Sequence, residues 1–90
     1  MLTLNEAIDQ IAAAVLRDHT AELTEVYRKY PTRANEPRKN LNHMVEHAIG
    51  VKVTAELKRV RTFGTYPSQV ENVPATQRIQ RKVFEGIRSR

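Results

Sequence analysis

The chain has 90 residues, no cysteine and a formal net charge of +5. Its length allows one small domain, residues 1–90, with a thin core, and the lack of cysteine excludes disulfide bonds and thiolate metal sites. No apolar run approaches the roughly 20 residues of a membrane span, and the N-terminus lacks the basic start of a signal peptide, so we expect a cytoplasmic protein without membrane contact.

Charge is unevenly distributed along the chain. Residues 1–27 carry five acidic side chains against Arg17 alone, a net charge of −4, which leaves +9 for the remainder. The acidic segment either neutralises basic helices inside the fold or a dimer, or leaves the basic part to face a polyanion such as nucleic acid. A solvated surface of mixed charge is the third explanation.

The first predicted helix opens at Thr3, because Glu6 three residues later completes a capping box. Apolar residues then recur at helical spacing, at Leu4, Ile8, Ile11 and Val15. This stripe either continues to Tyr30 as one helix of about 40 Å or breaks near residues 18–20. The sequence leaves both alternatives open.

Proline residues mark the next boundaries. Pro31 ends the first helix, residues 32–36 form a polar connector, and Pro37 suits the first turn of a second helix. The buried face of that helix is predicted to comprise Leu41, Met44, Val45, Ala48 and Ile49. We expect a break at Gly50, since glycine lowers helix stability by about 1 kcal/mol relative to alanine.

The stretch from residue 49 to residue 61 fits two structures. Its apolar residues alternate as in a half-buried strand, but they also continue the helical stripe of Val45 and Ile49. The tetrapeptide TAEL occurs at residues 20–23 and again at residues 54–57, each time with valine three residues later. The first copy favours helix over strand, so we predict helix for both and leave an internal duplication as a hypothesis.

Residues 63–67 are predicted to form a turn and residues 68–73 a connector. A last helix then begins near Pro74 and buries Ile79, Val83 and Ile87, with Phe84 beside them. The predicted fold is therefore all-α, a small bundle of three long helices that kinks divide into as many as five.

The predicted helix before Gly50, the pair Gly50-Val51 and the predicted helix after this pair together resemble a helix-turn-helix. In this resemblance the second helix, from about Thr54 to Arg61, would carry basic residues to a phosphate backbone. The segment departs from the motif at Glu46, four residues before the glycine, where a small residue is usual.

Basic residues on the last two helical segments are the predicted contact residues for nucleic acid or for an acidic protein partner. They are Lys52, Lys58, Arg59, Arg61, Arg78, Arg81, Lys82 and Arg88. The sequence predicts a small, regulatory or accessory DNA-binding protein that contacts phosphates and forms a homodimer. The alternative is a protein-protein interaction module, an inhibitor or adaptor that binds an acidic surface of a larger nucleic-acid machine.

The segment His43-Met44-Val45-Glu46-His47 matches the H-x-x-E-H zinc-peptidase pattern. Zinc enzymes of this kind need a third protein ligand and a substrate cleft, which so short a chain does not offer. The sequence also lacks a nucleophile elbow and a glycine-rich phosphate loop. We therefore expect no catalytic site, no metal and no cofactor.

Overall fold

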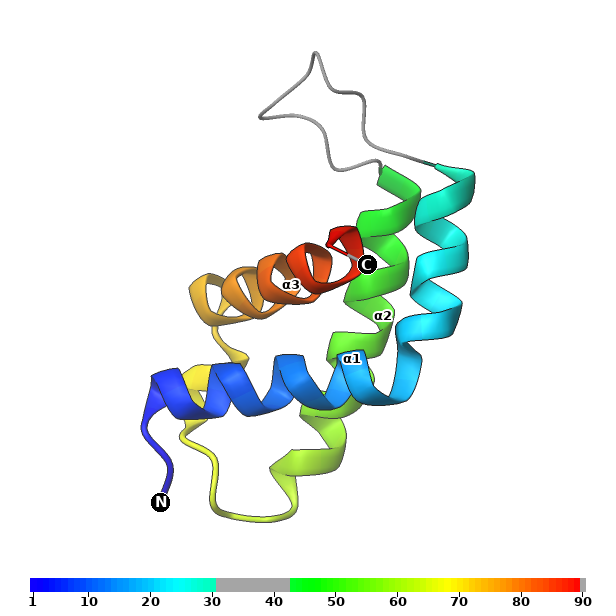
Figure 1. Ribbon diagram of the computed structural model, residues 1–90. Coiled ribbons are helices and arrows are strands. Elements are labelled where there is room, and N and C mark those ends of the chain that lie inside the picture. The colour runs from blue at the N-terminus through cyan, green and yellow to red at the C-terminus, as the bar shows by residue number, and fades with distance from the viewer. Residues whose placement is uncertain (31–42, 90) are drawn as a thin grey trace.

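The computed structural model describes residues 1–30 and 43–89, and these residues form helices and no strand. The helices are α1 (Leu4–Lys29), α2 (His43–Arg61) and α3 (Val73–Arg88), with a short 3-10 helix η1 (Ser68–Glu71) before α3 (Figure 1). The predicted all-α bundle of three helices is confirmed. The connector 32–36, the helix start at Pro37 and the core position Leu41 lie outside the described residues. None of the helices in the described part is long and apolar enough to cross a membrane.

The predicted capping box is present at the start of α1. The backbone N–H of Glu6 donates to Thr3 Oγ1 at 3.1 Å, and the backbone N–H of Thr3 donates to Glu6 Oε1 at 3.0 Å. The hydrogen bond that the Thr3 backbone N–H donates to its carboxylate lowers the pKa of the Glu6 carboxyl below its ordinary value. The N-terminal segment is also attached to the loop after α2, because Leu2 N–H donates to the carbonyl of Thr65 at 3.0 Å.

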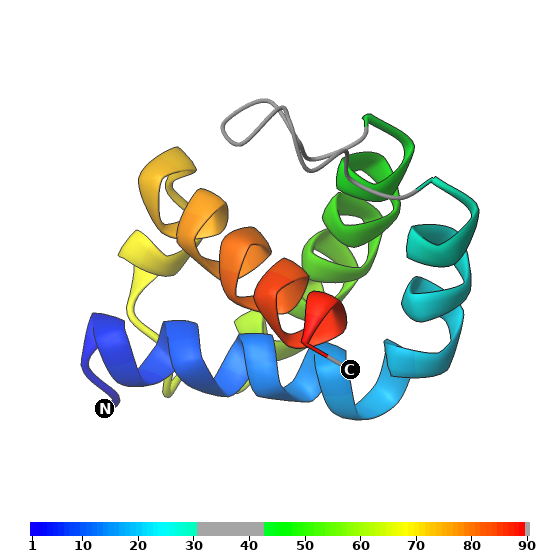
Figure 2. The ribbon, with the colours of Figure 1, turned by 45° about the horizontal axis from the view of Figure 1, so that its top comes forward.

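Helix α1 is one helix in its hydrogen bonding, but its axis changes direction between its blue and cyan portions (Figures 1 and 2). Thr20, in the middle of the helix, donates its hydroxyl to the carbonyl of Leu16 four residues back. A side-chain bond of this kind competes with the helical ladder and bends helices. The first half of α1 therefore runs along α3 and the second half along the start of α2 (Figure 2).

The core lies where α1 meets the other two helices. Ile8 and Ile11 of α1, Val53 of α2, and Ile79 and Val83 of α3 are fully inaccessible to solvent. Full burial of one such side chain stabilises the fold by about 1.5–3 kcal/mol. The predicted apolar stripes of the first and last helices are thus the buried faces of α1 and α3.

The break expected at Gly50 is wrong, because α2 continues through this residue from His43 to Arg61. Ile49 and Val53 on either side are buried, and their packing outweighs the cost of about 1 kcal/mol that glycine imposes on a helix. The strand alternative for this stretch is excluded by the same helix. No turn is left at Gly50 for a helix-turn-helix.

Helix α3 lies close to α1 at Gly86. A Cβ atom added to Gly86 would lie 2.6 Å from Leu16 Cδ1, so Leu16 would have to move. The absent side chain of Gly86 thus leaves room for Leu16 of the facing helix.

The two helical glycines are expected to respond oppositely to alanine. Gly50→Ala should raise the free energy of unfolding by about 0.5–1 kcal/mol, since the new Cβ lies 3.5 Å from Gln80 Nε2, an ordinary contact. Gly86→Ala should lower it by about 1 kcal/mol through overpacking against Leu16. Urea unfolding followed by circular dichroism measures both changes. A stabilised Gly86→Ala variant would contradict the close approach of α1 and α3.

Candidate interaction surface

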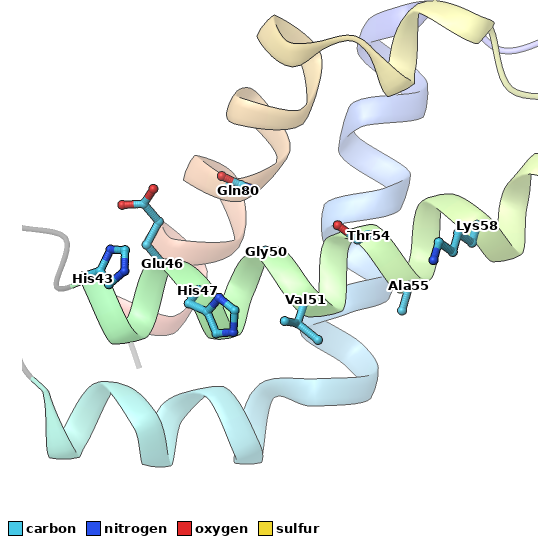
Figure 3. Close-up of a pocket in the computed structure, with 9 residues that line it drawn as sticks. All are labelled: His43, Glu46, His47, Gly50, Val51, Thr54, Ala55, Lys58 and Gln80. Carbon is cyan, nitrogen blue, oxygen red and sulfur yellow. The ribbon is translucent and has the colours of Figure 1, made fainter.

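An open groove runs along the outer side of α2, facing α3 (Figure 3). It has a volume of about 630 Å³ and a mostly apolar surface. Its described lining residues are His43, Glu46, His47, Gly50, Val51, Thr54, Ala55, Lys58 and Gln80. All but Gln80 come from α2, and Gln80 reaches in from α3 above Gly50 (Figure 3).

The helical repeat of α2 explains why the other described helices do not cover this face. The buried residues Val45, Ile49 and Val53 recur every four positions and form the core side of the helix. The groove residues have the same spacing on the other side, where the middle of the helix offers only small side chains at Gly50, Thr54 and Ala55. Val51 beside them is 51% exposed and adds to the apolar surface of the groove.

Two of the predicted contact residues form ion pairs with the acidic helix α1. Lys52 Nζ lies 2.9 Å from Glu22 Oε2, and Lys82 Nζ lies 2.9 Å from Asp9 Oδ1. Surface pairs like these, of which the one at Lys52 is half-buried, contribute only about 0.2–1 kcal/mol each to stability. They nevertheless match the first explanation of the charge pattern, in which acidic residues of α1 neutralise basic residues of the other helices.

Arg59 contacts both a carboxylate and an aromatic ring of its own helix end. Its Nε and Nη2 donate to the two carboxylate oxygens of Glu56 at 3.0 and 2.5 Å, and the Glu56 side chain is only 10% exposed. These hydrogen bonds raise the pKa of the Arg59 guanidinium above its ordinary value. The guanidinium carbon also lies 5.1 Å from the centre of the Phe63 ring, within range of a cation–π interaction.

Two further predicted residues also have intramolecular partners. Arg61 donates through Nε and Nη2 to the carboxylate of Glu71 in η1, which raises the pKa of the Arg61 guanidinium. Arg78 Nη2 donates to Asn5 Oδ1 at 2.9 Å. Both contacts are solvent-exposed, so a strong external anion could compete with them.

Lys58, Arg81 and Arg88 complete the predicted set, and they make no ion pair with any residue that the structure describes. All three are exposed. Lys58 lines the groove at the C-terminal end of α2. The eight predicted residues therefore do not form one free basic surface, because five of them already have partners within the fold.

The aromatic residues also have intramolecular contacts. Tyr27 and Phe84 pack edge to face, with ring centres 5.8 Å apart and an angle of 70° between the ring planes. Tyr66 donates its hydroxyl to Gln10 Oε1 at 3.3 Å. Stacking of bases on aromatic rings, the usual means of binding single strands, has little support here.

His43 and His47 lie one turn apart on α2, and both line the groove with Glu46 (Figure 3). Within the described residues, no group of three or more histidine, aspartate or glutamate side chains is placed to hold a metal ion. A tight zinc site usually needs four ligands in tetrahedral geometry, or three with an open position. The groove therefore offers two imidazoles on a helix surface.

The groove itself could not be read as a site from the sequence alone. The sequence shows small and polar residues at helical spacing along one side of α2, with Val51 among them. The structure adds that Val51 is exposed on this side. The position of Gln80 opposite Gly50 depends on how α3 crosses α2, which no spacing in the sequence records.

Comparison with known proteins gave no match: no family model, no curated protein and no solved structure matches this chain. Any function must therefore be argued from the chain's own geometry.

Zinc is expected to bind weakly and without effect on stability, because the two imidazoles one helical turn apart have no third convergent ligand among the described residues. Isothermal titration of the protein with zinc chloride and thermal unfolding with and without zinc measure this. Stoichiometric, tight binding that His43→Ala abolishes would contradict the expectation.

Proposed function

We propose that this chain is a non-catalytic protein-interaction module, of the adaptor or inhibitor kind, that docks a helix of a partner protein in the α2 groove. The observation that carries the proposal is the groove itself, a mostly apolar trough on α2 that the other described helices leave open. Amphipathic helices commonly bind other proteins by laying an apolar face in such a groove.

The dimensions of the groove suit a helix. Its lining extends from His43 to Lys58, which corresponds to about 22 Å along an α-helix. Small residues at the middle, Gly50, Thr54 and Ala55, allow a second helix to approach closely. Val51, 51% exposed in the free chain, would lose this exposure when the partner binds.

The ion pairs support a protein partner over an extended phosphate backbone. Contacts with many phosphates require basic side chains that are free to face them. Here Lys52, Arg59 and Lys82 are paired with carboxylates of the same chain. The positive charge of α2 and α3 is thus partly neutralised within the fold.

A substitution that fills the groove without adding charge tests the proposal. Helical peptides would be selected from a displayed library on the wild-type protein, and their affinities would be measured for the wild type, Ala55→Gln and Ala13→Gln. Ala55 lines the groove, whereas Ala13 is an exposed alanine of α1 outside it. Ala55→Gln is expected to weaken binding by about tenfold or more, because its side chain fills space that the peptide needs.

The control Ala13→Gln should leave peptide affinity unchanged, since the same substitution there does not reach the groove. A library that yields no helical binder, or binders that tolerate Ala55→Gln as well as Ala13→Gln, would rule out the groove as the docking surface.

Nucleic-acid binding is the second candidate function, and Lys58, Arg81 and Arg88 favour it because each is exposed and without an ion pair in the described structure. The neighbours Arg81 and Lys82 provide a matched test, as Lys82 is paired with Asp9. If phosphates are the ligand, Arg81→Ala should reduce the salt dependence of binding to random duplex DNA by about one unit. Lys82→Ala should reduce it less.

Binding to duplex DNA across a salt series measures both variants. The nucleic-acid candidate fails if DNA shows no salt-sensitive binding at low ionic strength. It also fails if Arg81→Ala and Lys82→Ala are indistinguishable from the wild type.

A further inference from the structure

Basic residues lie at one end of the groove and beside it on α3. Lys58 lies at one end of the groove, and Glu46 is the one acidic residue among its described lining residues. Arg81 and Arg88 lie one and eight residues after Gln80, which lines the groove. Because an α-helix turns by about 100° per residue, they are rotated about 100° and about 80° around the axis of α3 from Gln80. Both arginines are exposed, so they lie on the solvent side of the wall that Gln80 forms.

These cations make no ion pair among the described residues, whereas the other lysines and arginines of α2 and α3 are paired with carboxylates, except Arg78, which is hydrogen-bonded to Asn5. Lys52 and Lys82, by contrast, face α1 and are paired with Glu22 and Asp9. The fold therefore neutralises the side of α2 and α3 that faces α1 and leaves cations on the side that carries the groove. A partner that brings carboxylates to this side would complete the same pattern of charge pairing.

We infer that the occupant of the groove is an acidic amphipathic helix of a partner protein. Its apolar stripe covers Val51 and Ala55, and its flanking carboxylates face Lys58, Arg81 and Arg88. The inference rests on the proposed function and adds the charge of the partner to it. A nucleic-acid duplex would satisfy the cations but has no apolar stripe, so it would leave Val51 and the groove floor uncovered.

Synthetic peptides that differ only in flank charge test the inference. Three helical peptides of about 20 residues share one apolar stripe at i, i+3, i+4 and i+7 spacing and carry glutamate, glutamine or lysine on the flanks. Fluorescence anisotropy with the full chain gives their affinities. The glutamate peptide is expected to bind about tenfold more tightly than the glutamine peptide, and the lysine peptide more weakly than either.

Variants of the protein locate the charge effect. Arg81→Gln should reduce the preference for glutamate over glutamine flanks by about threefold, because it removes one facing cation. Lys82→Gln, the same loss of charge at the next position, should leave the preference unchanged since Lys82 pairs with Asp9. Added salt should lower the affinity of the glutamate peptide more than that of the glutamine peptide.

Each outcome separates the inference from the proposed function. Equal or tighter binding of the glutamine peptide, still weakened by Ala55→Gln, overturns the acidic partner but leaves the groove as a docking surface. No binding by any of the peptides, or binding that Ala55→Gln does not affect, overturns both. Displacement of the glutamate peptide by random duplex DNA, with DNA affinity weakened by Arg81→Gln but not by Ala55→Gln, assigns the cations to nucleic acid and also overturns the inference.

Discussion

The structure depends on the burial of the aliphatic stripe of α1 against two helices at once. Ile8, Ile11 and Val15 lie in the core shared with α3 and α2, and the bend in α1 lets its second half run beside the start of α2 (Figure 1). The polar flanks of α1 consequently face the flanks of both neighbours. Acidic residues of α1 meet basic residues there, as in the pairs of Asp9 with Lys82 and Glu22 with Lys52. With α1 on one side, the described helices leave the groove side of α2 open.

Local sequence signals predicted the elements well. The capping box at Thr3 and the apolar spacing of α3 depend on residues three or four positions apart, which a sequence displays directly. The prediction at Gly50 failed because a local propensity of about 1 kcal/mol is smaller than the packing of Ile49 and Val53 beside it. Tertiary burial, which no local pattern measures, decided the continuity of α2.

The candidate site was less predictable than the fold. A count of charges gives the surplus of positive residues but not the partner of each one. The partner of Lys82, for example, is Asp9, which lies on a different helix and far away in the sequence. Arg81, next to Lys82, makes no ion pair with the described residues. Neighbouring basic residues thus differ in availability because one turns toward α1 and the other toward solvent. The groove depends likewise on how α3 crosses α2, which puts Gln80 opposite Gly50.

An amide chemical-shift titration of the nitrogen-15-labelled full chain with the glutamate-flanked peptide tests the central claim most directly. The account predicts that the largest shifts fall on Gly50, Thr54, Ala55 and Gln80, the middle of the groove, while amides on the exposed side of α1, such as Ala13, stay unchanged. Shifts concentrated on α1, or spread evenly over the basic residues without the groove floor, would contradict it.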